Sequence, residues 1–319
     1  MKYRKSMNFY QNIYLLLLEK SNVWDKQHIF PGGLKHKEDT FYIIRRSGMK
    51  PGLFSHFRTN LARIDYAINN GMIPIVDMQN FKNSNLEEEE YCLVNAWEKY
   101  FQQPIGYTLE DAYSAKNIIL SDAGVPKDFP RDSMDFFADK NGELTYWRKI
   151  CREYIHLSPI VEQCFLQQQK LLFGDGKRIL GVLARGTDYV KVKPSKHAIQ
   201  PTAEQIIDKS KEVMVDYTCD KLFLVTEDKN IANRFAEEFG DKCLTNVKEY
   251  LDYEDGYLSE IDSEKKGDKF ERGLEYLVNI LLLSKCNCVV SGRTSGAVGA
   301  ALFTDGWEYS YFFDLGRYE

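Results

Sequence analysis

Short apolar runs alternate with helix-forming stretches along most of the chain, and this alternation limits the folds that the sequence can adopt. In the second half, the apolar runs at 178–185 and 221–228 are each followed by a stretch with helical spacing, at 202–217 and 229–240. Strands that alternate with helices predict a parallel sheet with crossover connections. The expected fold class is therefore α/β.

The first half of the chain shows the same alternation. A strand and turn are expected at 40–48, a helix at 53–71 that ends in an Asn-Gly pair, and further strands at 72–78 and 117–120. Because 319 residues exceed one ordinary hydrophobic core, two domains are expected.

A largely helical stretch from 133 to about 173 separates the two alternating regions. We place the predicted domain boundary at its end. The sequence thus predicts two Rossmann-like domains, 1–173 and 174–319, with parallel sheets that face a central cleft.

Composition excludes several other classes of protein. The net charge of −5 provides no general attraction for nucleic acid. The seven cysteines are scattered without a CxxC pair, which indicates reduced thiols in a cytoplasmic protein rather than a zinc site. The apolar run near the N-terminus is short and ends at Glu19 and Lys20, which favours an amphipathic helix over a signal peptide. No stretch approaches the ~20 apolar residues that span a bilayer.

Ligands bind beyond the carboxyl ends of the strands in open parallel sheets, so polar residues directly after an apolar run are candidates for a site. The first such run ends in Arg185, Gly186 and Asp188. The fork of Arg185 matches phosphate oxygens, and Gly186 would let a ligand approach the backbone. Asp188 is a candidate base or hydroxyl ligand, or else the partner of Arg185 in a pair that only holds the loop.

Two further strand ends carry polar residues. Thr226, Glu227 and Asp228 suit the recognition of hydroxyls or a base, although Asp228 alternatively caps the next helix. The third strand end, at 291–301, enters a turn rich in glycine and hydroxyl groups before a helix, and this predicts an anion site at the helix N-terminus. Its glycines alternatively serve only helix packing.

The first half offers one comparable segment. Gly52 precedes a helix, and its first turns carry Ser55, His56 and Arg58 as a second set of polar groups. His56 is alternatively a plain surface histidine. No DxD motif, Walker A loop, GxGxxG motif, nucleophile elbow or HExxH motif is present, so no metal or other cofactor is expected.

The segments "LARGTDY", "LVTED" and "SGRTSG", in this order and at this spacing, resemble the fucosyltransferase superfamily of GT-B glycosyltransferases. That superfamily includes bacterial nodulation and α1,2/α1,6 enzymes and protein O-fucosyltransferases. The resemblance implies a GDP-sugar donor, with GDP-fucose expected, and inversion without a metal. Two departures stand out: Gly186 replaces a second arginine of some members, and "GLFSH" stands where the family has G-x-G-N.

The resemblance also implies roles for individual residues. Arg185 matches the arginine at the β-phosphate and glycosidic oxygen, and Asp188 matches the acid of the same motif. The candidate bases are Asp188, His56 and Glu227. The other candidate donor-binding residues, implied by the family's nucleoside and diphosphate segments or by the glycine segment of the first half, are Gly52, Ser55, Arg58, Gly186, Thr226, Glu227, Asp228, Arg293, Thr294, Ser295 and Gly296.

The expected function is inverting, metal-independent transfer of fucose from GDP-fucose to a glycan in bacterial surface-polysaccharide synthesis. The expected partners are a nucleotide-sugar donor and a glycan or lipid-linked oligosaccharide acceptor, met in the cytoplasm at the inner membrane face. Two alternatives remain: a transferase for another GDP- or UDP-sugar, and a non-catalytic nucleotide- or glycan-binding protein with the same fold.

Overall fold

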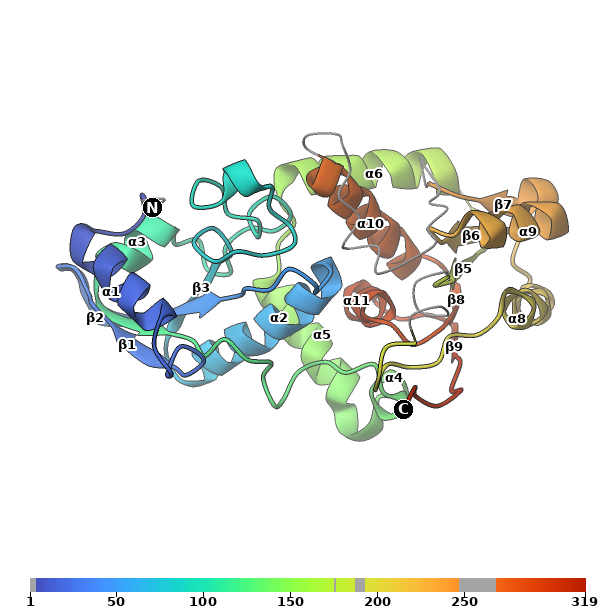
Figure 1. Ribbon diagram of the computed structural model, residues 1–319. Coiled ribbons are helices and arrows are strands. Elements are labelled where there is room, and N and C mark those ends of the chain that lie inside the picture. Colours follow the sequence, from blue (N-terminus) through green and yellow to red (C-terminus); the bar gives the residue numbers. More distant parts are fainter. Residues whose placement is uncertain (1–3, 175, 187–192, 247–267) are drawn as a thin grey trace. The chain divides into compact units, whose positions relative to one another are not determined.

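A computed structural model describes residues 4–174, 176–186, 193–246 and 268–319 (Figure 1). The chain forms two compact units, each made of several segments. Unit 1 comprises Met1–Phe129, Lys149–Pro159 and Ser263–Glu271, and unit 2 comprises Pro130–Arg148, Ile160–Asp262 and Arg272–Glu319.

The two units differ from the contiguous halves expected from the sequence. Residues 130–148 and 160–173 group with unit 2 rather than with the first half of the chain. The assignment of an acceptor side to the first half and a donor side to the second stays a prediction.

Unit 1 contains a four-stranded sheet in the order β1-β4-β2-β3. The central strand β2 is parallel to both β3 and β4, as the alternation predicts, and β1 adds an antiparallel edge that the sequence did not reveal. The strands are β1 (His28–Phe30), β2 (Lys35–Arg45), β3 (Ile73–Asp77) and β4 (Ala115–Leu120).

Helices cover the two faces of this sheet. Residues of α1 (Phe9–Glu19) and α3 (Leu109–Ser114) share a core with Phe41 and Ile43 of β2. Side chains alternate across a strand, and Tyr42 accordingly packs against Tyr66 of α2 (Leu53–Asn69) on the opposite face. The even-numbered positions of β2 thus face α2.

The predicted N-terminal helix is confirmed as α1, and its apolar side faces outward in part. A capping box between Asn8 and Gln11 starts the helix, and buried Gln11 donates to the backbone oxygens of Pro31 and Tyr113. Four apolar side chains of α1 are exposed: Phe9, Tyr10, Ile13 and Leu17.

Within the described residues, no helix has the length and apolar character needed to cross a membrane.

Helical segments dominate the chain between the two sheets, as predicted. They are α4 (Met134–Phe137), η2 (Lys140–Gly142), α5 (Glu143–Tyr154) and α6 (Pro159–Phe173). A separate short 3₁₀ helix, η1 (Glu88–Glu90), lies between β3 and α3.

Unit 2 contains a five-stranded, fully parallel sheet in the order β7-β6-β5-β8-β9. Its strands are β5 (Ile179–Leu183), β6 (Lys221–Val225), β7 (Cys243–Leu244), β8 (Cys288–Ser291) and β9 (Tyr309–Phe312). Its remaining helices are α8 (Ala203–Asp216), α9 (Lys229–Phe239), η3 (Gly240–Lys242), α10 (Asp268–Ser284) and α11 (Ser295–Phe303). Figure 1 shows α8 and α9 beside the strands, which they contact.

The local signals in unit 2 explain these bounds. Thr202 caps α8 by accepting from the amide of Gln205, as the sequence predicts. Gly240 ends α9 with a φ of 52°, a backbone conformation that side chains disfavour. All seven cysteines are free, as expected, and no group of potential metal ligands occurs among the described residues.

Candidate functional site

Three strand ends of unit 2 lie next to one another, as the sequence predicts. Leu183, the last residue of β5, pairs with Val225 of β6 on one side and with Ser291 of β8 on the other. Beyond this row, the amide of Ala184 still donates to the backbone oxygen of Val225 at 3.0 Å. The polar residues that follow the three strands therefore emerge at one edge of the sheet.

An ion pair joins the first two strand ends. A terminal nitrogen of Arg185 lies 3.1 Å from Oε1 of Glu227, and each side chain is 20% exposed. The arrangement therefore positions Arg185 at the sheet edge while leaving it within reach of solvent.

Glu227 is a partner of Arg185 that sequence reasoning missed. The sequence offered Asp188, which lies outside the described residues, as does Thr187. The signal for Glu227 was present in the register, because both residues come two positions after ladder partners, Leu183 and Val225.

Asp228 serves as a helix cap, which confirms the alternative interpretation of this residue. Its Oδ1 accepts from the amides of Asn230 at 2.8 Å and Ile231 at 3.1 Å and so begins α9. Buried Thr226 accepts from the amide of Asp228 at 3.2 Å. These two side chains therefore shape the turn that carries Glu227.

Gly186 is required by packing between the strand ends. A β-carbon at this position would overlap the side chain of Asp228. The space beside the Gly186 α-carbon is thus occupied by the chain itself, whereas the sequence suggested the approach of a ligand. The segments that follow β5 and β6 therefore pack closely at Gly186 and Asp228.

The third strand end leads into α11, a helix without charged residues whose positions 296–302 are buried. Thr294 caps it by accepting from the amide of Ala297 at 3.1 Å, and Ser295 is half-buried. A β-carbon at Gly296 would overlap the hydroxyl of Tyr276 in α10. Gly296 therefore permits close helix packing, which was the alternative interpretation of this turn.

Arg293 is buried beside the last segment of the chain. Its guanidinium lies 2.9 Å from Oδ1 of Asp314 and donates to the backbone oxygen of Gly316 at 3.1 Å. Its Nε has no hydrogen-bond partner among the described residues. Asp314 therefore neutralises much of the charge that the sequence offered to a diphosphate.

The candidate site residues of unit 1 lie in the N-cap and first turns of α2. Gly52 is its N-cap with extended backbone, and no side chain caps this end of the helix. Ser55 is half-buried, and the Arg58 guanidinium stacks 5.1 Å from the ring centre of Phe129.

His56 is buried, so its interpretation as a surface residue is wrong. Only 1% of the residue is exposed, and burial, aided by the charge of Arg46, lowers the pKa of the imidazole to about 3. The Ser84 hydroxyl donates to the backbone oxygen of Pro51, so its oxygen is left to accept from Nε2 of His56 at 3.3 Å. A base with so low a pKa accepts a proton poorly at neutral pH, which opposes a role as general base.

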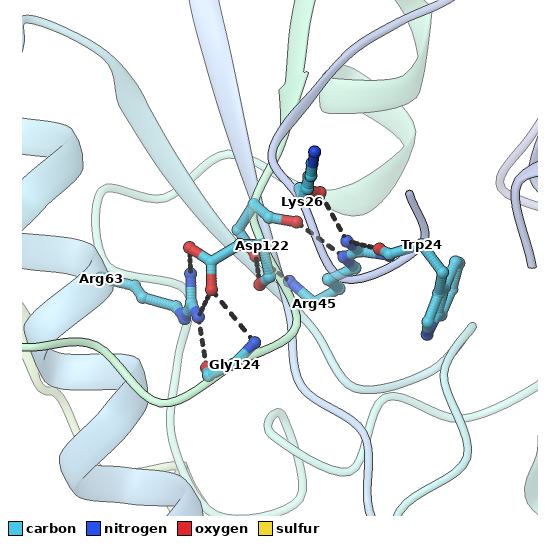
Figure 2. A network of polar contacts seen from close by, with 7 residues as sticks. Trp24, Lys26, Arg45, Arg63, Asp122 and Gly124 are labelled. Carbon is cyan, nitrogen blue, oxygen red and sulfur yellow. Dashed lines mark hydrogen bonds and ion pairs between the residues drawn. The ribbon is translucent and has the colours of Figure 1, made fainter. Parts of the chain in front are cut away.

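A network of buried arginines in unit 1 was not predicted from the sequence (Figure 2). Arg45 donates to the backbone oxygens of Ser121 at 2.6 Å, Lys26 at 2.8 Å and Trp24, and its guanidinium stacks 4.2 Å from the Trp24 ring centre. Arg63 forms a two-pronged pair with Asp122 at 2.9 and 2.6 Å.

Comparison with models of protein families and with curated proteins gives no match for this sequence. Solved structures do match. POFUT1 in complex with GDP-fucose has a TM-score of 0.50 at 9% identity, with 88% of this chain and 99% of that chain covered. NodZ from Bradyrhizobium has a TM-score of 0.49 at 15% identity, covering 87% and 96%, and Arabidopsis thaliana FUT1 in complex with GDP has 0.45 at 11%, covering 96% and 79%.

The likeness to POFUT1, with a TM-score of 0.50, confirms at the level of fold the resemblance expected from the sequence. The chain is an α/β protein of the GT-B fold class with a parallel sheet in unit 2 and a mainly parallel sheet in unit 1. At 9% identity the likeness to POFUT1 concerns the fold alone.

Proposed function

We propose that the protein is an inverting, metal-independent glycosyltransferase that uses a GDP-sugar, with GDP-fucose as the first candidate donor. The observation that carries the proposal is the partly exposed guanidinium of Arg185 at the carboxyl edge of the unit 2 sheet, 3.1 Å from Glu227. The site where open α/β sheets bind ligands thus contains a partly exposed cation suited to a diphosphate. The fold shared with POFUT1, whose structure contains GDP-fucose, supports the choice of donor.

In the proposed reaction, an acceptor hydroxyl oxygen attacks the anomeric carbon while the bond to the β-phosphate oxygen breaks. GDP leaves with the bonding electron pair, and the acceptor proton passes to a base or to solvent. Arg185 stabilises the charge that develops on the departing diphosphate. Asp188 and Glu227 are the remaining candidate bases from the sequence, and Glu227 also positions Arg185.

Not all predicted donor contacts support the proposal equally. Thr226 and Asp228 already hold the turn around Glu227, and Arg293 already pairs with Asp314. Both arginines are paired with a carboxylate, but the side chain of Arg185 is 20% exposed and that of Arg293 only 7%, so we propose Arg185 as the main donor contact in unit 2. The proposed acceptor is a glycan or lipid-linked oligosaccharide, and the proposed setting is bacterial surface-polysaccharide synthesis in the cytoplasm, at the inner membrane face.

Thermal stabilisation by GDP, UDP, ADP and CMP tests the donor class. We expect GDP to raise the unfolding temperature of the wild-type protein most, and Arg185→Ala to lose this effect while it stays folded. With GDP-fucose and an acceptor, Arg185→Ala is expected to lower kcat roughly 100-fold or more. Stabilisation by UDP alone, or turnover by Arg185→Ala at the wild-type rate, would refute the assignment.

Release of free sugar from the donor separates an enzyme from a binding protein. We expect slow hydrolysis of GDP-fucose in the absence of an acceptor, and its loss in Arg185→Ala. GDP binding with neither hydrolysis nor transfer would instead support the alternative of a non-catalytic nucleotide-binding protein.

A further inference from the structure

Arg46 is a buried cation that has no partner among the residues that the structure describes. Only 6% of the residue is exposed, and its Nε makes no hydrogen bond. The guanidinium forms no ion pair with any described carboxylate. Buried charges in proteins are normally paired, so this side chain requires an explanation.

The neighbouring arginines Arg45 and Arg63 each have several partners, although Nη1 of Arg45 and Nε of Arg63 also lack a hydrogen bond among the described residues. Figure 2 shows Arg45 surrounded by backbone oxygens and Arg63 engaged by Asp122 and by the backbone oxygen of Gly124. Both oxygens of Asp122 are already bonded to Arg63. The carboxylate in this network therefore leaves Arg46 uncompensated.

The surroundings of Arg46 add positive charge. Arg46 follows Arg45 at the end of β2, and even-numbered positions of this strand face α2. Arg63 lies on α2, and its charge repels that of Arg46. Burial together with this repulsion lowers the pKa of Arg46 to about 10. The charge of Arg46 also acts on His56, in the first turn of α2.

The face of α2 toward Arg46 carries two further unsatisfied groups. Nδ1 of His56 and Oδ1 of Asn60, one helical turn apart, are buried without hydrogen-bond partners among the described residues. Because Nε2 of His56 donates to Ser84, Nδ1 is an acceptor. The N-terminus of α2 brings no acidic residue in its first turn and no side-chain cap. The Arg46 guanidinium and the first amides of α2 can donate to an anion, and Nδ1 of His56 and Oδ1 of Asn60 can accept from a hydroxyl.

We propose that Arg46, with His56 and the amino-terminal turn of α2, forms a binding site for an acidic sugar, that is, a sugar carrying a carboxylate or phosphate group. The oxyanion accepts from the guanidinium and is favoured by the positive end of the helix. A neighbouring sugar hydroxyl donates to Nδ1 of His56. Resting on the proposed transferase function, this ligand is the acceptor, because the donor diphosphate is assigned to Arg185 of unit 2.

Binding of glucuronate, glucose and inorganic phosphate to the full chain, measured by thermal shift and isothermal titration without any donor, tests the site. We expect wild-type protein to bind glucuronate and phosphate saturably and glucose weakly or not at all. Arg46→Met is expected to bind both anions at least about tenfold more weakly. It is also expected to unfold at a higher temperature than wild type in the absence of ligand, because the unpaired charge is gone.

Two controls separate this site from other cationic positions. Lys116→Met removes one exposed positive charge from the same unit and is expected to leave anion binding unchanged. Arg185→Ala is expected to lose GDP binding and to retain glucuronate binding, so failure of the proposed donor site and failure of this site are distinguishable. Should Arg46→Met fold poorly, Arg46→Gln provides the same test with a polar side chain.

The outcomes decide between a ligand site and a structural arginine. Loss of glucuronate and phosphate binding in the Arg46 variants supports the site. Wild-type protein that binds phosphate through Arg46 but does not bind glucuronate would overturn the assignment to a sugar acid in favour of free phosphate. Wild-type protein that binds neither anion, or Arg46 variants that bind both as wild type does, would overturn the proposal.

Discussion

Protonation of His56 is expected to make the stability of the protein fall as the pH drops below neutrality. In the folded chain the imidazole is buried, and its pKa lies at about 3, below the ordinary value of 6.5. As the pH falls through 6.5, the unfolded chain takes up a proton at this position and the folded chain does not. Acid therefore stabilises the unfolded state relative to the folded one.

The size of this effect follows from the difference between the two pKa values. Between pH 7 and pH 5, the unfolded imidazole changes from mostly neutral to mostly charged, which costs the folded protein about 2 kcal/mol. The figure requires only that the folded pKa lies well below 5, as burial and the neighbouring Arg46 both favour. At neutral pH the difference between the two pKa values hardly affects the stability of the folded state. As the pH falls toward 3, this difference lowers the free energy of unfolding progressively.

Urea unfolding at pH 7 and pH 5, followed by tryptophan fluorescence and circular dichroism, measures this loss. His56→Gln keeps a donor for Ser84 and removes the titrating group, so its stability is expected to fall by about 2 kcal/mol less than that of wild type over this interval. His156→Gln, which alters an exposed histidine, is the matched control and is expected to follow wild type. An identical pH dependence for His56→Gln and wild type would refute the burial argument.

Two further substitutions test the packing and the ion pairs on which the candidate sites depend. Gly186→Ala is expected to destabilise the protein by roughly 1–3 kcal/mol in urea unfolding, because the added β-carbon overlaps Asp228, whereas Gly124→Ala meets only ordinary contact distances and serves as control. Asp122→Asn is expected to cost about 2–3 kcal/mol, because it strands the buried Arg63 guanidinium while its own side chain is 43% exposed; unchanged unfolding in urea would contradict this reading of Figure 2.

The fold was largely predictable because its signals are local. Apolar runs followed by helical spacing predict β5, β6 and the helices after them, and Thr202 and Gly240 mark helix ends through their own chemistry. The antiparallel strand β1 escaped prediction because three residues, of which Ile29 is exposed, carry no periodic pattern. Its place depends on β4, a partner far along the chain.

The candidate sites were only partly predictable, because side-chain partners come from distant segments. The position of Arg185 at a sheet edge follows from the strand pattern, but its pairing with Glu227 follows from the register of two separate strands. Gly186 looked like an approach for a ligand, and only the fold places Asp228 against it. The burial of His56 was likewise not predictable, because histidine is intermediate between buried and exposed residue types.

The burial of Arg46 without a partner among the described residues could not be predicted from the sequence, and it is this burial that suggests a ligand. Backbone oxygens bind the guanidinium of Arg45 and a carboxylate binds that of Arg63, although one nitrogen of each lacks a hydrogen bond among the described residues. Arg46 instead raises the free energy of the folded state, and an apolar side chain of similar volume in its place would relieve that cost. Groups that oppose stability in this way are concentrated where proteins bind ligands, because the ligand supplies the missing partner. The same reasoning separates Arg46 from Arg293, whose charge Asp314 already compensates.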